Sequence, residues 1–148
     1  MIQFKKYDKV YLEKSWIWLQ DDEIRKLTNT PFFSAESQQR WFMSLESKTD
    51  YLIWGIELNN SPIGACGLKY ITNQTAEYWG YIGEKSYWGK GYGKYLLHYC
   101  IQKAIDLHLK TITLKVTRTN QRAIKLYVKN GFIEIKHEDD LIVMSYSL

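Results

Sequence analysis

A glycine-rich segment between a strand pattern and a helix pattern constrains the fold of this chain most. Residues 76–83 are expected to form a strand. Residues 88–93, with the sequence WGKGYG, come next, and Leu97, Ile101, Ala104 and Ile105 then recur at helical spacing. This order directs several backbone N–H groups to one point, where the helix dipole also favours negative charge. Taken alone, the glycines are as consistent with a flexible turn as with a phosphate-binding loop.

Two common nucleotide-binding patterns do not fit this segment. The dinucleotide-binding fingerprint needs a third glycine where Lys94 stands. The Walker A pattern needs a serine or threonine after its lysine, and neither Lys90 nor Lys94 is followed by one. If the loop binds phosphate, it therefore belongs to another class of anion site.

The rest of the chain predicts one mixed α/β domain. Strand patterns cover residues 2–7, 51–58, 62–71, 76–83 and 111–117, and a final hairpin joins 132–135 to 141–147 around 137–140. Helices are expected over 8–20, from a Ser34 cap to about residue 45, after the glycine loop, and after Asn120, whereas 21–31 is expected to be irregular. Residues 51–83 should form an antiparallel meander. This order predicts a sandwich, with helices on both faces of a mostly antiparallel sheet. With two prolines and no repeat, residues 1–148 are expected to be a single domain.

Composition excludes several classes of protein. A net charge of +4 suits an anionic ligand but is too small to indicate nucleic-acid binding. No apolar run could span a bilayer, and charges break any signal-peptide core, so a cytoplasmic protein without a membrane partner is expected. Cys66 and Cys100 are expected to be buried free thiols. Since the three histidines lack ligand spacing, no metal is expected.

Two sequence blocks carry a family resemblance. The glycine segment resembles the pyrophosphate loop of the GNAT acetyltransferases, Gln/Arg-x-x-Gly-x-Gly/Ala: Gly91 and Gly93 match, and Trp88 stands where Gln or Arg is usual. Residues 120–132 resemble the family's Asn-x-x-Ala-x-x-x-Tyr-x-x-x-Gly-Phe helix. The resemblance is strong over residues 75–136, and it is closest to the ribosomal-protein N-terminal and amino-sugar acetyltransferases. It implies the GNAT α/β (α+β) fold, with about seven strands flanked by four helices.

The resemblance also implies acetyl-CoA as cosubstrate and direct transfer of its acetyl group to an amine. The loop should hold the phosphates, while backbone N–H groups near the end of the preceding strand should bind pantetheine and stabilise the oxyanion. Asn120 is expected to cap its helix and is also a candidate contact of the pantetheine arm. The cofactor-binding residues expected on this basis are Tyr81, Ile82, Gly83, Trp88, Gly89, Lys90, Gly91, Tyr92, Gly93, Lys94 and Asn120.

Two residues are candidates for the chemistry. A lysine-like amine must lose a proton before it attacks, which costs about 4–5 kcal/mol at pH 7. Glu77 is the candidate base, but a solvated strand residue and a water path to bulk solvent are equally good alternatives. Tyr127 matches the family's tyrosine that protonates the departing thiolate, while periodicity alone makes it a core residue.

The acceptor amine is less constrained than the cofactor. The family places it between residues 16–33, Trp41, the central strands and the C-terminal hairpin, where the acidic residues 21–23 could attract an amine. An amino sugar or nucleotide-linked amino sugar fits the mild basicity and the 16% aromatic content best, ahead of a protein N-terminus and then a polyamine. A non-catalytic acetyl-CoA sensor is the alternative of another class. Since many family members dimerise through their sheets, a homodimer is left open.

Overall fold

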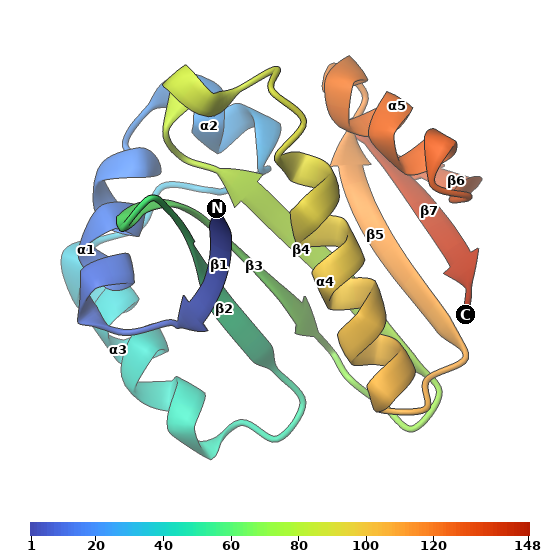
Figure 1. The fold of residues 1–148 in the computed structure, drawn as a ribbon, viewed down its shortest axis with the longest axis horizontal. Helices are drawn as coiled ribbons and strands as arrows, with labels where there is room; N and C mark the ends of the chain where they lie inside the picture. The colour runs from blue at the N-terminus through green and yellow to red at the C-terminus, as the bar shows by residue number, and fades with distance from the viewer.

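A computed structural model describes residues 1–148 and shows one seven-stranded sheet covered by helices (Figure 1). The strands are β1 (Ile2–Lys6), β2 (Leu52–Leu58), β3 (Ser61–Lys69), β4 (Thr75–Ile82), β5 (Thr111–Thr117), β6 (Ile133–Glu138) and β7 (Leu141–Ser147). The helices are α1 (Lys9–Trp18), α2 (Asp22–Leu27), α3 (Ala35–Ser44), α4 (Gly93–Asp106) and α5 (Gln121–Lys129). The predicted architecture is therefore confirmed, with four longer helices and the short α2.

The sheet contains one parallel neighbour pair, and this pair opens at one end. The strand order is β1-β2-β3-β4-β5-β7-β6, and only β4 and β5 run parallel. Their pairing stops at Tyr78 and Leu114, although β4 stays paired to β3 as far as Ile82 and β5 stays paired to β7 as far as Thr117. The two strands therefore separate over residues 79–82 and 115–117, which leaves backbone groups there without a strand partner. The predicted meander of β2, β3 and β4 is confirmed.

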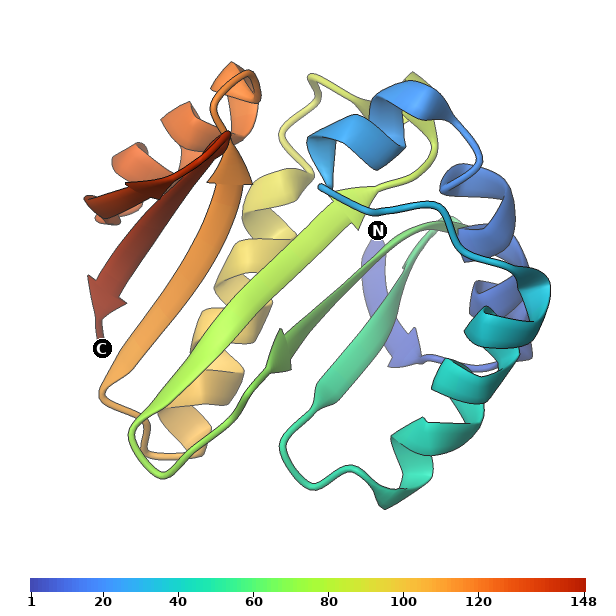
Figure 2. The same cartoon turned by 180° about the vertical axis from the view of Figure 1, so that it is seen from behind.

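The two faces of the sheet carry different helices, as Figures 1 and 2 show from opposite sides. The main core lies under α4 and α5 and includes the fully buried Leu97 and Cys100 of α4 with Cys66 of β3. A smaller core on the other face joins Tyr7 and Tyr11 to Ala65 and to the partly buried side chains of α3. Both cysteines are buried free thiols, as predicted.

The expectation that residues 21–31 are irregular was wrong, because α2 forms there. Asp21 caps it by accepting a hydrogen bond from the backbone N–H of Ile24 at 3.1 Å. The nearly buried Arg25 donates to the Leu19 carbonyl at 2.7 Å, and its guanidinium stands 4.0 Å from the centre of the Phe32 ring. Tertiary contacts of one arginine thus stabilise a helix that is too short to form by itself.

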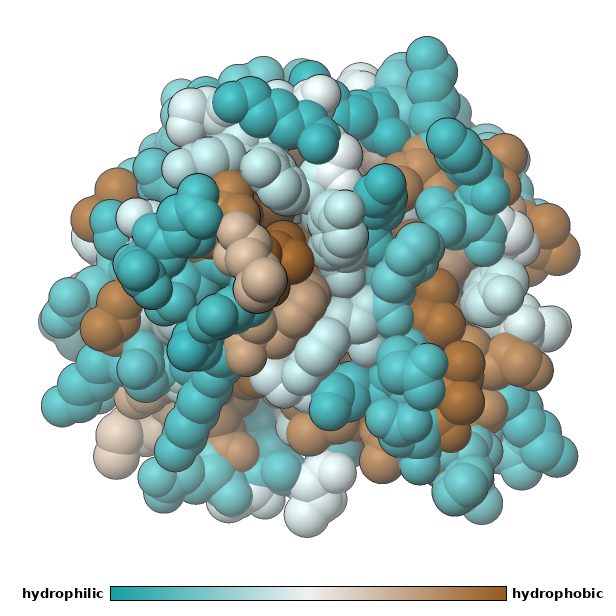
Figure 3. Space-filling view, in the orientation of Figure 1, coloured by the Kyte–Doolittle hydropathy of each residue, from teal (hydrophilic) through white to brown (hydrophobic).

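Smaller differences concern the last hairpin and the long helix. β6 runs to Glu138, so the hairpin turn is shorter than the predicted residues 137–140. Ile105 was expected on the buried stripe of α4 but is 47% exposed. None of the helices is long and apolar enough to cross a membrane. The face in Figure 3 is largely hydrophilic, with hydrophobic residues in separate groups.

Candidate active site

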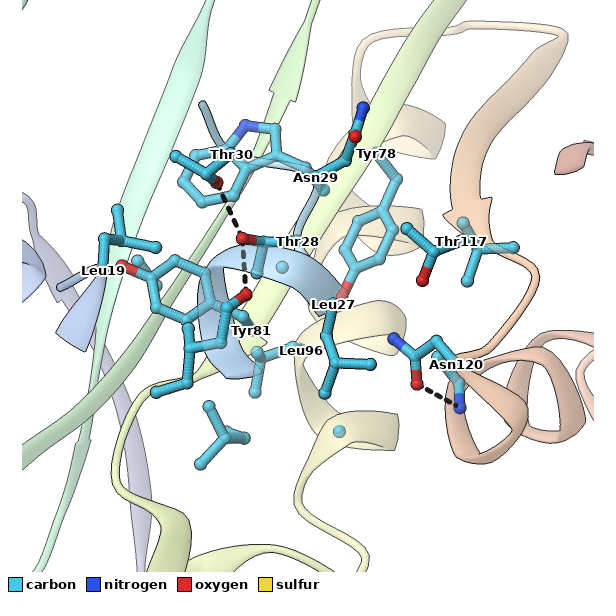
Figure 4. A pocket seen from close by; sticks show the side chains of 18 of the residues that line it. Leu19, Leu27, Thr28, Asn29, Thr30, Tyr78, Tyr81, Leu96, Thr117 and Asn120 are labelled. Atoms are coloured by element: carbon cyan, nitrogen blue, oxygen red, sulfur yellow. Dashed lines mark hydrogen bonds between the residues drawn. The ribbon is translucent and has the colours of Figure 1, made fainter. Parts of the chain in front are cut away.

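A cavity of about 1050 Å³ follows the opening between β4 and β5. At one end it is lined by the glycine loop, the start of α4 and residues of α5, and we call this end the loop half. At the other end it is lined by Tyr7, Ser15, Trp41, Tyr51, Trp79 and Tyr81, which we call the aromatic half. Figure 4 shows Tyr78 and Tyr81 of β4, Thr117 at the end of β5, Asn120 at the start of α5, and residues of the α2 region around this space. One continuous cavity therefore reaches both faces of the sheet.

The loop half presents an uncapped helix start. Gly89 and Gly91 have φ angles of +74° and +85°, a region that other residues rarely adopt, and both line the cavity. A Cβ atom at either position would meet no atom within 4 Å, so the side of the loop is open. Tyr92 precedes α4 without a side-chain cap, which leaves the first N–H groups of the helix available. This arrangement suits phosphate groups.

The backbone of β4 turns alternate residues toward the opening. The Gly83 N–H donates to the Ile63 carbonyl of β3 at 2.7 Å, so it is engaged within the sheet. Alternation along an antiparallel pair gives Tyr81 the same orientation as Gly83 and turns Gly80 and Ile82 toward β5. The expected N–H donors over residues 81–83 are thus corrected: Ile82 faces the opening, whereas the N–H groups of Tyr81 and Gly83 do not.

Trp88 links the loop to β4 and to α5. Its indole N–H donates to the Ile82 carbonyl at 2.8 Å. Its ring lies 5.5 Å from the Arg122 guanidinium carbon and 5.6 Å from the Lys85 ammonium nitrogen. Arg122 lines the cavity and was missed at the sequence level, although its place two residues after the helix cap Asn120 was a usable signal. The Trp88 ring therefore packs beside the Arg122 cation in the loop half, at the position where the family pattern has a polar Gln or Arg side chain.

The remaining cofactor-binding residues expected from the sequence divide into two groups. Lys94 and Asn120 line the cavity, and Asn120 caps α5 by accepting from the Ala123 N–H at 3.3 Å. Gly83 and Lys90 do not line it, and the Lys90 ammonium lies 5.7 Å from the centre of the Tyr87 ring. Thr117 was not anticipated: it lines the cavity with a buried hydroxyl oxygen that has no hydrogen-bond partner.

Tyr127 borders the cavity from α5. Its side chain is buried, its ring packs edge-on against Tyr78 at 6.3 Å, and its hydroxyl makes no hydrogen bond to the protein. Burial raises the pKa of Tyr127 well above its usual value, because the phenolate would be poorly solvated. The phenol is therefore protonated at neutral pH and has a proton to donate.

Glu77 lies away from the cavity. It sits in the paired part of β4, opposite Thr113 of β5, and does not line the cavity. Its carboxylate is 3.4 Å from the Lys69 ammonium, and Lys69 does line the cavity. The structure thus gives Glu77 an ion-pair partner and places Tyr127, but not Glu77, at the cavity wall.

No aspartate or glutamate lines the cavity. Its charged lining residues are Lys69, Lys94, Lys115, Arg122 and Lys129. The acidic residues that could have attracted an amine are engaged elsewhere. Asp21 and Glu23 contact the Lys85 ammonium at 2.8 Å and 2.9 Å, and Asp22 pairs with Arg25. The hydrogen bond from Lys85 lowers the pKa of Asp21. Residues of the C-terminal hairpin, which the family pattern had included, do not line the cavity.

No group of three or more histidine, cysteine, aspartate or glutamate side chains is arranged to hold a metal ion.

Comparisons with known proteins identify the family of this chain. Residues 13–132 match the model of the acetyltransferase (GNAT) family. Over 145 residues the chain is 25% identical to acetyltransferase PseH of Campylobacter jejuni, covering 95% of this chain and 90% of that protein. It is 26% identical over 102 residues to an uncharacterized protein of Methanocaldococcus jannaschii, where the match covers 68% of this chain but only 21% of that protein.

Solved structures share the fold over almost the whole chain. The crystal structure of C. jejuni N-acetyltransferase PseH in complex with acetyl coenzyme A has a TM-score of 0.77 at 20% identity, covering 99% of both chains. Spermidine N-acetyltransferase from Vibrio cholerae, in complex with CoA and spermine, has a TM-score of 0.89 at 20% identity, covering 99% of this chain and 95% of that one. At such identities the likeness shows the fold alone.

Proposed function

The chain belongs to the acetyltransferase (GNAT) family, and from this premise we propose that its cavity binds acetyl-CoA and transfers the acetyl group directly to an amine. The observation that carries the proposal is the continuity of the cavity: it joins an uncapped helix start and glycine loop, through the gap between β4 and β5, to a separate aromatic half. One ligand can therefore enter from each side and meet at the gap. We also propose that residues 1–148 act as a single domain, since one sheet unites all seven strands.

The residues present fit acetyl-CoA. The Gly89–Gly91 backbone and the first N–H groups of α4 suit the pyrophosphate, and Arg122 and Lys94 add positive charge. The unpartnered hydroxyl of Thr117 offers a hydrogen bond to the pantetheine amides. When bound, acetyl-CoA supplies the activated acetyl thioester.

We assign the protonation of the departing thiolate to Tyr127. The phenol is protonated at neutral pH, as any tyrosine of ordinary or raised pKa is, and Tyr127 borders the cavity with no hydrogen-bond partner for its hydroxyl in the protein. The backbone N–H of Ile82, turned toward the gap, is positioned to stabilise negative charge developing on the carbonyl oxygen. Both groups act without a metal or a covalent acyl-enzyme.

We propose that the amine loses its proton to water in the cavity rather than to Glu77. Glu77 is bound to Lys69 and lies outside the cavity wall. No other carboxylate lines the cavity, so solvent remains as the proton acceptor. The sequence left open whether Glu77 or a water path accepts this proton, and we propose the water path.

For the acceptor, we propose an amino sugar or a nucleotide-linked amino sugar. The absence of any carboxylate from the cavity wall, with Lys69 and Lys115 lining it outside the loop half, favours an acceptor that is uncharged or anionic apart from its amine. Aromatic walls suit flat or ring-shaped groups. The same charge pattern argues against a polyamine, even though the V. cholerae neighbour was solved with spermine. A protein N-terminus remains the second candidate, because the cavity is open to solvent.

The test is a thiol-release assay with acetyl-CoA and four acceptor classes: amino sugars, nucleotide-linked amino sugars, N-terminal peptides and polyamines. Turnover that is largest with an amino sugar supports the proposal. Turnover confined to polyamines or peptides would refute the acceptor class but keep the enzyme class. Acetyl-CoA binding by calorimetry without any turnover would favour the sensor alternative over an enzyme.

A further inference from the structure

Three hydroxyl groups from separate elements meet in the aromatic half of the cavity. The Tyr7 hydroxyl donates to Ser15 Oγ at 2.8 Å, and the Tyr81 hydroxyl donates to the same oxygen at 3.2 Å. Tyr7 precedes α1, Ser15 lies in α1, and Tyr81 lies in β4. All three line the cavity, and Ser15 and Tyr7 are only 2% and 6% exposed. We call these residues the hydroxyl cluster.

The cluster retains hydrogen-bonding capacity after its internal bonds are counted. Three hydroxyl groups carry three donors, and the two internal bonds use two of them. The Ser15 O–H has no acceptor in the protein, and neither phenol oxygen receives a hydrogen bond. The cluster can therefore offer one donor and the oxygen lone pairs of Tyr7 and Tyr81 to a ligand in the cavity. Since unmet polar groups are costly to bury, a ligand with matching hydroxyl groups gains from meeting them.

The surroundings keep this cluster neutral. Burial raises the pKa of Tyr7 to about 12 and also raises that of Tyr81. The neighbours of both tyrosines are aromatic rings: Trp41 lies edge-on to Tyr7 at 5.8 Å, and Trp18 lies edge-on to Tyr81 at 6.1 Å. The Trp18 indole N–H is occupied by Glu84, so it does not compete for the cluster. A neutral hydrogen-bonding point within apolar walls selects uncharged polar groups rather than ions.

We propose that Tyr7, Ser15 and Tyr81 form the specificity-determining site of the acceptor, and that they bind the hydroxyl groups of a polyhydroxylated amine. This proposal rests on the function proposed above and deepens it, because it states which side chains separate a sugar amine from an alkyl amine. The acceptor's O–H groups donate to the phenol oxygens of Tyr7 and Tyr81, and one of its oxygens accepts from Ser15. The reacting amine is then presented to the gap next to Ile82, the residue that follows Tyr81 in β4.

The experiment compares two amines that differ in their hydroxyl groups. Glucosamine carries a ring, one amine and several hydroxyls, and cyclohexylamine carries the ring and amine alone. Initial rates are measured by thiol release at saturating acetyl-CoA for the natural protein, Tyr7→Phe, Tyr81→Phe and Ser15→Ala. Each tyrosine variant keeps its ring and therefore the aromatic packing.

The natural protein is expected to prefer glucosamine by at least about tenfold in kcat/KM, because a site built for hydroxyl groups discriminates against an analogue without them. Each phenylalanine variant should raise the KM for glucosamine by about ten- to a hundredfold while changing that for cyclohexylamine little. The acetyl-CoA dissociation constant, measured by calorimetry, should not move in any of them.

Tyr11→Phe is the matched control. Tyr11 lies beside Tyr7 with its ring centre 6.0 Å away, and its buried hydroxyl has no partner and does not line the cavity. This variant should keep the glucosamine preference and the melting temperature. Equal losses on both amines, or turnover without a hydroxyl preference in the natural protein, would overturn this inference alone. No turnover of either amine, together with no turnover of the amino sugars and nucleotide-linked amino sugars in the assay above and with acetyl-CoA still bound, would overturn the acceptor class proposed above and this inference with it.

Discussion

The loop half of the cavity is built mainly from backbone, whereas the aromatic half is built from side chains. In the loop half, Gly89 and Gly91 open the chain to a ligand and the start of α4 offers its N–H groups. In the aromatic half, rings from α3, from the segment before β2 and from β4 line the cavity together with a cluster of hydroxyls. Backbone binding suits a ligand that stays constant while side chains change, as we propose for acetyl-CoA. Side-chain binding suits a ligand that differs from one enzyme to the next, since each side chain can change without altering the fold.

The largest effect is expected from Gly91→Glu in the loop half. The substitution places a non-glycine residue at a φ of +85° and adds negative charge where phosphate should bind. The acetyl-CoA dissociation constant should rise by more than about a hundredfold, as measured by calorimetry. Gly91→Ala is the control: it adds the backbone strain without the charge, and its Cβ meets no atom within 4 Å. Normal acetyl-CoA binding by the glutamate variant would remove the phosphate assignment of this loop.

The next effect is expected at the boundary between the halves, from Tyr127→Phe. The kcat should fall by about a hundredfold because the thiolate loses its proton donor, while the acetyl-CoA dissociation constant stays nearly constant. Stopped-flow and steady-state rates measure the first, and calorimetry the second. Tyr78→Phe removes a neighbouring buried phenol and serves as the comparison variant. An unchanged kcat in Tyr127→Phe would exclude Tyr127 as the acid.

A moderate effect is expected from Arg122→Gln. Removing the cation held over the Trp88 ring should weaken acetyl-CoA binding by about tenfold and reduce its dependence on salt. Titration calorimetry at two salt concentrations measures both. Lys125→Gln, a change on the same helix at a residue that does not line the cavity, is the control. Equal weakening in both variants would mean that only the net charge of the protein affects acetyl-CoA binding. Arg122 would then make no specific side-chain contribution to the loop half.

The smallest effect is expected from Glu77→Gln. Because Glu77 pairs with Lys69 outside the cavity wall, kcat/KM should change by less than about threefold. The pH–rate profile measured in parallel should keep its shape. A loss of the acidic limb, where the rate rises as a base loses its proton, would restore Glu77 as the general base and would contradict proton transfer to water.

The parts that sequence reasoning predicted are those that depend on local backbone chemistry. Residues 88–93 were expected to form a glycine-rich loop before a helix, and Gly89 and Gly91 have positive φ there. Asn120 was expected to cap α5 and does so. The helix α2 was missed although Asp21 caps it, because the contacts of Arg25 with Leu19 and Phe32 lie just outside the helix and do not follow helical spacing. Pattern recognition therefore sufficed where glycine and cap residues act on their own segment, and failed where a side chain reaches back to a neighbouring segment.

The sequence by itself determined that a strand, a glycine loop and a helix would follow one another, because these depend on φ preferences and short-range hydrogen bonds. Only the tertiary structure decided which face of β4 meets the acceptor half. Alternation puts Glu77, Trp79 and Tyr81 on one face of β4. The point at which β5 separates from β4 lies between them, so Glu77 stays in the paired sheet and Tyr81 lies at the cavity. The meeting of Tyr7, Ser15 and Tyr81 likewise required the packing of α1 on the sheet, which no local pattern in the chain encodes.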